Sequence, residues 1–482
     1  MPTFTIFGPQ LPSCFTPLHP QAEWIEGKPC PYKPCYDYCQ FAAPHCLWDL
    51  GLEDVWTRVD KFVQRHRAAL TVADASPVPS LGYHTGTQRK FIQVFCRYMM
   101  RGGEENSVAR IASHLELSGH EVFRFWRASE EWTGKEKPNL LRQMVLAWKN
   151  QSVLGRLREL NKRVLPDAWI FHNIIPVVSF GAYGLARELN VPVVQWIHNY
   201  RPISPSGTLC AGGQMLDPKD PWRVWKEIRH ATWHGHLGTA GLALAYARLH
   251  QHGDFESVKA WVAVSEEMRQ IFLRAGYPEN RFFCLHHSWD IRPPIDLNLD
   301  EGYFLFLGRM VEEKGVRFLM DLWQRPELKG LKLVMAGEGE LADEYRGKTS
   351  ANIQWVGFVQ GVEKRRLLAG CRALLFPCLW AEPLTTVVYE AYEQGKPVLA
   401  SALGGLKELV VDRDTGRMLP AGDIEAWTQA VLEHAQNPGL SRERGHHGLT
   451  WLNTRVSPAA WNRQFDEIMA RALPALPPRS LT

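Results

Sequence analysis

Short apolar runs alternate with amphipathic stretches along the chain from Lys90 onward. Apolar runs of this length between turn residues are typical of buried strands, and the spacing of apolar residues between them is that of helices. Alternating strands and helices predict an α/β fold with a mostly parallel sheet and helices on both faces. The ranges predicted as strands are 91–96, 121–126, 168–171, 193–197, 261–264, 303–307, 331–336, 353–357, 373–376 and 397–400.

The alternation restarts after residues 293–296, Pro-Pro-Ile-Asp, and so predicts two doubly wound, Rossmann-like halves, 89–292 and 293–457. A last helix, about 459–473 within the terminal segment 458–482, is expected to pack back on the first half. Sheets of this kind bind ligands outside the carboxyl ends of their strands. Two facing halves therefore predict a ligand-binding cleft between them.

Residues 1–88 lack this alternation. They predict one helix, about 52–70, followed by a linker over 71–88 that is rich in proline and small residues. Four cysteines gather in a short stretch, Cys30, Cys35, Cys39 and Cys46. Because a cytoplasmic setting disfavours disulfides, these thiols suit a structural Zn²⁺ or iron ion, with free structural thiols as the alternative. The pattern predicts a small cysteine-rich N-terminal extension.

Composition changes this picture little. The chain has 482 residues, of which 45% are hydrophobic, and this is ordinary for a globular protein. Lys and Arg number 55 against 51 Asp and Glu, an excess too small for a dedicated nucleic-acid binder. The start has no basic region typical of a signal peptide, and no stretch reaches the ~20 apolar residues that a spanning helix needs. A cytoplasmic protein is therefore expected.

Two cations follow the predicted strand 303–307. Arg309 comes just after the strand, and Lys314 lies where the next helix begins. Backbone N–H groups and the helix dipole favour an anion at such a point, and two cations there suit a diphosphate. The alternative is a solvated pair of cations beside Glu312 and Glu313.

Two acids follow the predicted strand 373–376. Glu382 lies in the loop at the carboxyl end of the strand, and Glu390 lies in the following helix among apolar residues. Carboxylates accept the paired hydroxyl hydrogen bonds that sugars and riboses offer, and a half-buried acid needs partners. The alternative is an exposed loop acid and an acid on a helix surface.

Gly404 and Gly405 follow the predicted strand 397–400 and precede a short helix, where their N–H groups could meet a phosphate. Asp412 and Asp414 mimic a metal-binding Asp-x-Asp, but they lie between two short apolar runs and predict a turn. No catalytic metal is expected in this half.

These residues, in this order, resemble glycosyltransferase family 4, the retaining enzymes of the GT-B fold, over about 90–473. The resemblance implies that Arg309 and Lys314 hold the diphosphate of the donor. It also implies that Glu382 contacts the transferred sugar and that Glu390 binds the ribose of the nucleotide.

The resemblance further assigns the segment Gly-Gly-x-x-Glu, which ends at Glu408, to the donor side, and it implies no metal cofactor. The family usually has Phe-Gly shortly after the first acid, where this chain has Leu384 and Thr385. The N–H groups of these two residues are expected to reach the sugar, with a different donor preference. Residues 286–290 replace the Asn-Gly-Val-Asp stretch usual in the family.

In the first half, the run His198-Asn199-Tyr-Arg resembles a signature of one branch of the family, which implies that His198 meets the transferred sugar. Gly102 and Gly103 resemble the Gly-Gly loop of the acceptor side, with a plain strand-to-helix turn as the alternative. His172 ends another predicted strand and joins Asn199 on the acceptor side. A hydrogen-bonded structural histidine is the alternative for His172.

A basic amphipathic helix is predicted over about 139–164. Such a helix can lie on an anionic membrane, which would suit a lipid-linked acceptor and a peripheral contact with the inner face of the membrane. The alternative is a helix of the Rossmann-like half with its apolar side in the core.

The expected function is transfer of a sugar from a nucleotide-diphosphate sugar to a hydroxyl of a glycan or lipid-linked acceptor, with retained anomeric configuration. The pathway expected is synthesis of cell-envelope polysaccharide, lipopolysaccharide or glycolipid, with no nucleic-acid partner. Two alternatives are a phosphorylase-like reaction on the same fold and a degenerate, non-catalytic binding subunit. The N-terminal segment resembles the cysteine-rich tail of ADP-heptose-type glycosyltransferases.

Overall fold

The computed structural model describes residues 3–7, 22–26, 52–71, 88–97, 103–133 and 137–474. The chain divides into two compact units, Met1–Leu81 and Gly82–Thr482. The described part of the first unit contains a parallel strand pair and one helix, β1 (Thr3–Phe7), β2 (Ala22–Glu26) and α3 (Leu52–Thr71).

The sequence pattern predicts this helix but neither of the two strands. The four clustered cysteines, Cys30, Cys35, Cys39 and Cys46, lie outside the described residues. A metal site at these thiols therefore stays a prediction.

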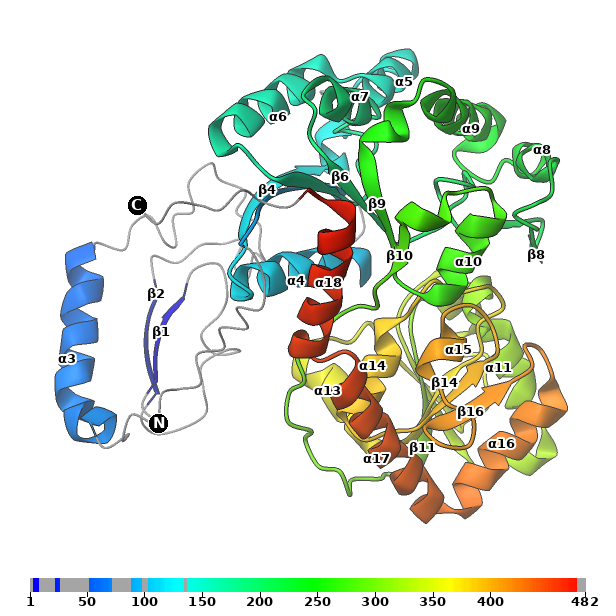
Figure 1. Ribbon diagram of the computed structural model, residues 1–482. Coiled ribbons are helices and arrows are strands. Elements are labelled where there is room, and N and C mark those ends of the chain that lie inside the picture. Colours follow the sequence, from blue (N-terminus) through cyan, green and yellow to red (C-terminus); the bar gives the residue numbers. More distant parts are fainter. Residues whose placement is uncertain are drawn as a thin grey trace. The chain divides into compact units, whose positions relative to one another are not determined.

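The first sheet of the second unit has six parallel strands in the order β10-β9-β6-β5-β3-β4. Figure 1 labels β4, β6, β9 and β10 of this sheet. The strand order of the sheet reverses between β3 and β5, and this is the place where doubly wound sheets bind ligands. The strands are β3 (Lys90–Arg97), β4 (Glu121–Ala128), β5 (Ala168–Phe171), β6 (Val193–Ile197), β9 (Val258–Ala263) and β10 (Phe282–Cys284). The helices are α4 (Gly103–Leu117), α5 (Leu140–Trp148), α6 (Gln151–Val164), α7 (Gly181–Glu188), α8 (Arg223–Arg229), α9 (Gly235–Gln251) and α10 (Glu266–Arg274).

The second sheet has six parallel strands in the order β13-β12-β11-β14-β15-β16, with the reversal between β11 and β14. The strands are β11 (Tyr303–Leu307), β12 (Lys332–Ala336), β13 (Ile353–Gly357), β14 (Cys371–Phe376), β15 (Val398–Ser401) and β16 (Gly416–Leu419). The helices are α11 (Val316–Leu322), α12 (Glu340–Tyr345), α13 (Gly361–Gly370), α14 (Thr386–Glu393), α15 (Leu406–Leu409), α16 (Ile424–Gln436), α17 (Pro438–Arg455) and α18 (Pro458–Ala472). Two α/β halves with parallel sheets confirm the predicted fold class.

The single helix predicted over 139–164 is wrong, because the chain forms two helices with a break at Asn150. The side chain of Asn150 accepts a hydrogen bond from the N–H of Val153 and caps α6, while its Nδ2 donates to the carbonyl oxygen of Val177 at 2.8 Å. Helix α6 buries Val153, Leu154, Leu157 and Val164. The apolar side of this basic helix therefore lies in the core, and a membrane-facing role for it has no support in the fold.

Helix α18 belongs to the C-terminal segment but packs on the first sheet, against α4 and β9. The ring of Trp196 in β6 stacks on Trp461 and Phe465 of α18, with centroids 6.0 and 6.4 Å apart. The indole nitrogen of Trp461 also donates to the carbonyl oxygen of His286 at 3.0 Å. The apolar core of the first half thus includes the last helix of the chain.

The carboxyl edges of the two sheets meet. Tyr200, which follows β6, donates its hydroxyl hydrogen to the carbonyl oxygen of Ala381 at 3.2 Å. Ser265, which follows β9 and caps α10, donates to the carbonyl oxygen of Pro383 at 2.6 Å. Ala381 and Pro383 both lie in the loop after β14. None of the helices in the described ranges combines the length and the apolar character needed to cross a bilayer.

Candidate functional site

The predicted donor residues of the second half gather where its strand order reverses. Arg309 follows β11, and Lys314 ends the short 3-10 turn Glu312–Lys314 before α11. Glu382 lies in the loop after β14, and Glu390 lies in α14. Because β11 and β14 are neighbours and parallel, these residues lie at the same edge of the sheet.

Lys314 and Glu382 form a buried ion pair. The Nζ atom of Lys314 lies 2.5 Å from Oε2 of Glu382, and the two side chains are only 12% and 11% exposed. The ammonium group also lies 5.1 Å from the ring centroid of Phe376 and 5.8 Å from that of Trp380. The ion pair holds the loop acid in place beside the turn that leads into α11.

Gly315 allows Lys314 to reach this position. It has a φ of +76°, and a Cβ atom there would lie 2.0 Å from the carbonyl oxygen of Pro377. Only glycine accepts both the left-handed backbone and this close approach. The loop after β11 therefore contacts the loop after β14 directly.

Arg309 is exposed, and its guanidinium has no hydrogen-bond or ion-pair partner in the described part of the chain. A surface cation held at the carboxyl end of β11 has its full charge and all its donors free for an anionic ligand. The exposure of Arg309 is also what the alternative of a solvated cation predicts, whereas Lys314 is buried beside Glu382 and does not fit that alternative.

Glu390 has one satisfied and one unsatisfied oxygen. Its Oε1 accepts a hydrogen bond from Nζ of Lys364 in α13 at 2.8 Å, whereas Oε2 is buried and has no partner among the described residues. A buried carboxylate oxygen without a donor is costly and marks a place where a ligand hydroxyl fits. Burial lowers the pKa of Arg110 in α4, while Asp290 and Glu390 raise it, so Glu390 also faces a cation of the first half.

Gly404 and Gly405 bring two loops together. A Cβ atom on Gly404 would lie 2.3 Å from the carbonyl oxygen of Glu382, and one on Gly405 would lie 2.2 Å from that of Pro383. The N–H of Gly405 donates to the carbonyl oxygen of Glu382 at 2.8 Å. That N–H is therefore occupied, contrary to the expectation that it faces a phosphate.

Leu384 and Thr385 lead into α14. Leu384 is buried, and Thr385 is the N-cap, whose Oγ1 accepts a hydrogen bond from the N–H of Val387. The pair therefore fixes the start of the helix that carries Glu390.

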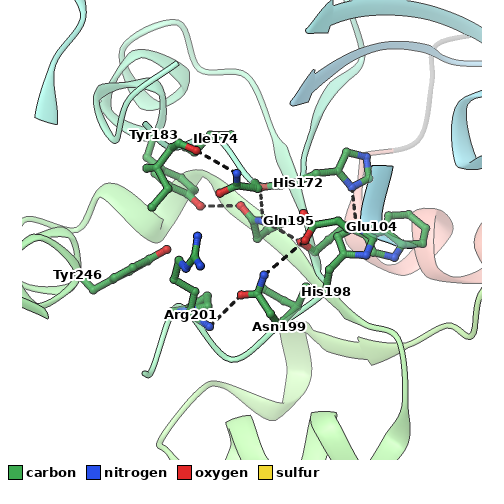
Figure 2. A pocket seen from close by; sticks show the side chains of 14 residues that line it. Glu104, His172, Ile174, Tyr183, Gln195, His198, Asn199, Arg201 and Tyr246 are labelled. Atoms are coloured by element: carbon green, nitrogen blue, oxygen red, sulfur yellow. Dashed lines mark hydrogen bonds between the residues drawn. The ribbon is translucent and has the colours of Figure 1, made fainter. Parts of the chain in front are cut away.

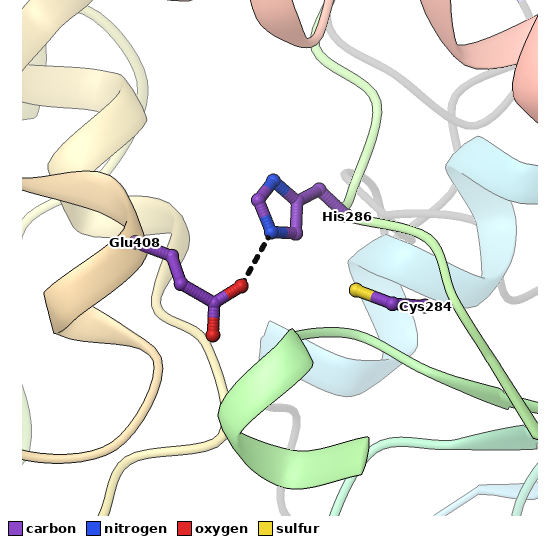
Figure 3. A group of neighbouring side chains, drawn as sticks. All are labelled: Cys284, His286 and Glu408. Atoms are coloured by element: carbon purple, nitrogen blue, oxygen red, sulfur yellow. Dashed lines mark hydrogen bonds and ion pairs between the residues drawn. The ribbon is translucent and has the colours of Figure 1, made fainter. Parts of the chain in front are cut away.

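Glu408, which the resemblance assigns to the donor side, contacts the first half. Its carboxylate accepts the N–H groups of Glu266 and Glu267 at 2.8 Å each, at the start of α10 in the first half, and it bonds Nε2 of His286 at 2.9 Å. Figure 3 shows this contact with Cys284 beside it, and the three ligand atoms lie within 4.8 Å of one another. Both oxygens of Glu408 are accounted for by these bonds, which join the two halves.

In the first half, His172 and His198 lie side by side at the carboxyl ends of β5 and β6 (Figure 2). Nδ1 of His172 is 3.0 Å from Nε2 of His198. The ring of His287, after β10, stacks on His198 with a centroid distance of 5.9 Å. Burial lowers the pKa of His198 to about 3 and holds that of His172 well below its usual range, with the neighbouring His198 adding to the effect. Both imidazoles are neutral at pH 7.

A small cavity of about 30 Å³ lies behind these histidines, lined among others by Glu104, Asn199, Arg201 and Tyr246. This volume suits about one water molecule rather than a sugar. Asn199 donates from Nδ2 to Oε2 of Glu104 at 3.4 Å and accepts the N–H of Arg201 with Oδ1. Asn199 is thus a structural partner of α4 and of its own loop.

Gly103 is the first residue of α4, whereas Gly102 lies outside the described residues. Asp412, Arg413 and Asp414 form the predicted turn, with Arg413 in the left-handed region at a φ of +63°. The oxygen Oδ1 of Asp412 accepts the N–H of Met418 at 2.9 Å. The turn predicted at Asp412 and Asp414 is therefore confirmed.

Sequence reasoning misses three residues that the structure places at the site. Lys364 and Arg110 flank Glu390, and Gln93 contacts His172. Lys364 lies in a run of charges whose members look alike in sequence. Gln93 gives the clearest signal, since it is a polar residue inside an apolar strand, and it is fully buried.

Two family models match the second unit. The model described as Glycosyltransferase Family 4 matches residues 101–291, and the model described as Glycosyl transferases group 1 matches residues 301–437. These two ranges follow the division between the two sheets. Neither match extends into residues 1–88.

Relatives of known name match the same region. The chain is 29% identical over 171 residues to the lipopolysaccharide core biosynthesis glycosyltransferase LpsE of Rhizobium meliloti, covering 33% of this chain and 47% of that protein. It is 24% identical over 400 residues to a GDP-mannose-dependent alpha-mannosyltransferase of Mycolicibacterium smegmatis, covering 79% of this chain and 95% of that protein. The chain spans between 35% and 47% of the length of the first curated relatives that it matches.

Among solved structures, HepE of Anabaena in complex with UDP-glucose superposes with a TM-score of 0.53 at 16% identity. The superposition covers 80% of this chain and 100% of HepE. At this identity the likeness concerns the fold, with its two facing parallel sheets.

Proposed function

Because the chain belongs to glycosyltransferase family 4 and has the GT-B fold, we propose that it transfers a sugar from a nucleotide-diphosphate sugar to an acceptor hydroxyl, with retention of the anomeric configuration. The bond between the anomeric carbon and the diphosphate breaks, and a bond to the acceptor oxygen forms. The nucleoside diphosphate leaves as the second product.

The unsatisfied oxygen of Glu390 is the observation that carries this proposal. The carboxylate is anchored by Lys364 through one oxygen, and no donor among the described residues reaches the other. The paired hydroxyls of a ribose are donors of the kind that a carboxylate accepts. A nucleotide bound beside α14 would satisfy the buried oxygen.

Arg309 and Lys314 supply the positive charge next to that position. As the sugar leaves, negative charge develops on the diphosphate, and fixed cations stabilise that charge without reorganising. Arg309 has its donors free, and Lys314 is held by Glu382 within the same edge. We assign these residues the task that a divalent cation performs in other enzymes, and so propose a metal-independent reaction.

Glu382 and His198 come from opposite halves and are assigned to the transferred sugar. The loop of Glu382 contacts the first half through Tyr200, two residues after His198. A carboxylate accepts hydrogen bonds from sugar hydroxyls, a neutral imidazole can donate one or accept one, and neither attracts the diphosphate by charge. This division leaves the charged part of the donor to Arg309 and Lys314.

The acceptor is proposed to be a glycan or a lipid-linked glycan of the cell envelope. The support is the role of the relative LpsE in lipopolysaccharide core biosynthesis. The donor class is supported by the GDP-mannose-dependent relative and by UDP-glucose in the structure of HepE.

The test is a panel of UDP-, GDP- and ADP-sugars incubated with the purified full chain, with release of the nucleotide and the anomeric configuration of the product as readouts. The variant Arg309→Ala is measured beside Arg442→Ala, which removes an exposed arginine of α17 in the same half. We expect turnover with at least one donor, a product with retained configuration, loss of turnover in Arg309→Ala and full turnover in Arg442→Ala.

Three results would contradict the proposal. An Arg309→Ala variant with full activity would remove the diphosphate assignment. Sugar phosphate formed when inorganic phosphate is the acceptor would indicate phosphorolysis instead. Binding of a donor without turnover, across the panel and with added acceptors, would indicate a binding subunit.

A further inference from the structure

Gln93 lies in β3 of the first half, between β5 and the edge strand β4, with its side chain fully buried and hydrogen-bonded. The indole N–H of Trp126 donates to its Oε1 at 3.1 Å. Its Nε2 donates to the carbonyl oxygen of Val108 at 3.0 Å. An indole nitrogen can only donate and a carbonyl oxygen can only accept, so these two contacts fix which end of the amide is which.

The orientation of Gln93 determines the proton position on His172. Nε2 of Gln93 lies 3.0 Å from Nε2 of His172, and the amide nitrogen has only hydrogens to offer. Nε2 of His172 must therefore be the acceptor. A neutral imidazole carries a single N–H, so the hydrogen of His172 is on Nδ1.

The same reasoning passes to His198. Nδ1 of His172 lies 3.0 Å from Nε2 of His198, and because Nδ1 carries the hydrogen, Nε2 of His198 accepts it. His198 then keeps its own hydrogen on Nδ1. The described residues give Nδ1 of His198 no hydrogen-bond partner, and His198 as a residue is half-buried. The hydrogen-bonded series Trp126, Gln93, His172 and His198 thus ends on the Nδ1–H of His198, which has no acceptor among the described residues.

We propose that Gln93 and His172 are positioning residues that fix the tautomer of His198, so that its Nδ1–H is presented as a hydrogen-bond donor to a hydroxyl oxygen of the transferred sugar. This inference rests on the proposed function for the identity of the ligand, whereas the tautomer itself is a property of the free protein. The opposite tautomer would present a lone pair and would require the sugar hydroxyl to donate. The hydrogen bonds from Gln93 to His172 and from His172 to His198 therefore fix, before any ligand binds, that a sugar hydroxyl must accept a hydrogen bond from His198.

The first experiment measures the tautomers directly. The full chain is labelled with ¹⁵N-histidine, and long-range ¹H–¹⁵N correlations at pH 7 distinguish the two neutral tautomers and the cation. Signals of the two rings are assigned as those missing from His172→Phe and His198→Asn. Both rings are expected to carry hydrogen on Nδ1, and a ring with hydrogen on Nε2, or a cationic ring, overturns the proposal.

The second experiment reverses the direction of the hydrogen bonds that join residue 93, His172 and His198. In Gln93→Glu the carboxylate still accepts from Trp126 but cannot donate to His172, so His172 must move its hydrogen to Nε2, and His198 must do the same. The inverted tautomers and an at least tenfold lower kcat/KM are expected, whereas Gln151→Glu, at the exposed start of α6, leaves both unchanged. An unchanged tautomer of His198 in Gln93→Glu overturns the relay.

Gln93→Glu can misfold because it leaves the carbonyl oxygen of Val108 without its donor. A second variant, which keeps the volume of the His172 ring, therefore tests the relay independently. His172→Phe removes both ring nitrogens, and His198 is then expected to show a mixture of tautomers. A single Nδ1–H tautomer in this variant would show that His172 does not set it. If no donor is turned over by the wild type, the proposed function fails, but the tautomer signals still decide the relay.

Discussion

The two cations assigned to the diphosphate differ in how the protein holds them. Arg309 is exposed and has no partner in the described structure, whereas Lys314 is buried in an ion pair with Glu382. Sequence spacing treats them alike, because both follow one strand within a few residues. The difference means that one cation serves the ligand alone, while the other also supports the fold.

Replacing each of these cations by alanine separates the two tasks. Arg309→Ala is expected to lower kcat/KM about 100-fold and to leave the unfolding temperature unchanged, because no folded contact is lost. Lys314→Ala leaves the carboxylate of Glu382 buried without its partner, which costs about 3–5 kcal/mol of stability. Thermal unfolding beside steady-state kinetics measures both effects. An equal loss of stability in the two variants would contradict the assignment.

Glu390→Gln tests whether Oε2 of Glu390 accepts a hydrogen bond from the ribose of the donor. The amide keeps the shape of the side chain but removes the charge, and a hydrogen bond to a charged group contributes about 1.5–3 kcal/mol. We expect the KM for the donor to rise about 10- to 100-fold, with a smaller change in kcat, in initial-rate measurements. Glu363→Gln, on the exposed face of α13 beside Lys364, is the matched control. A normal KM in Glu390→Gln would place the nucleotide elsewhere.

At the scale of elements, the strands are the most predictable part of the fold. The ranges 168–171, 193–197 and 303–307 agree with the observed strands residue by residue, because a buried parallel strand is apolar along its whole length. The break at Asn150 escapes prediction because the helical spacing of apolar residues continues across it. The hydrogen bond from Asn150 to the carbonyl oxygen of Val177, which stabilises the break, joins residues that are distant in sequence. The short edge strand Gly416–Leu419 escapes for a similar reason, as its sequence also fits a turn.

The residues of the site differ in the same way: local sequence predicts some of them, and contacts between distant segments determine the others. Residues whose role depends on position along one strand or loop, such as Arg309, are found from the sequence. The pairing of Lys314 with Glu382 and the contact of Glu408 with α10 depend on how loops meet in space, and spacing carries no information on that. The carboxylate of Glu408 accepts hydrogen bonds from the N-terminus of α10, a contact that its position in the Gly-Gly-x-x-Glu segment does not indicate.

Two glycine substitutions test how the loops of the second half meet. Gly315→Ala forces a left-handed residue and a contact of 2.0 Å with the Pro377 carbonyl, so it is expected to cost more than about 2 kcal/mol and to lower activity by displacing Lys314. Gly155→Ala, in the interior of α6 with open space around its Cβ, is expected to gain about 0.5–1 kcal/mol. Urea unfolding of both variants measures the contrast. Equal stabilities would contradict the close contact of the two loops.

At the scale of the molecule, polar contacts join the two halves at the edges where the proposed ligand binds. Tyr200, Ser265 and Glu408 each bond across the junction. Helix α18 joins the halves a second time, through the stack of Trp461 and Phe465 on Trp196. The apolar contact persists whatever the protonation of the acids, whereas the contact of Glu408 depends on its charge.

The pH dependence of stability reports on that charged contact. Burial raises the pKa of Glu408, but hydrogen bonds from His286 and from the N–H groups of Glu267 and Glu266 outweigh it, so the pKa lies below its ordinary value of 4.5. A carboxyl with a lowered folded pKa adds stability above its unfolded pKa and loses that contribution as the pH falls through the folded pKa. Wild type should therefore unfold at a higher temperature than Glu408→Gln between about pH 6 and 8, and the gap should close below about pH 4.5.

Thermal unfolding of wild type and Glu408→Gln across this pH range checks the prediction, with Glu443→Gln on the exposed side of α17 as the control. The control should follow wild type at every pH, because Glu443 makes no contact in the described structure that its charge would strengthen. A gap that stays constant down to about pH 3 would mean that the variant loses packing rather than charge. A gap that closes only for Glu408→Gln would show that the junction of the halves, and with it the geometry shared by Glu382 and His198, is held in part by one titrating carboxylate.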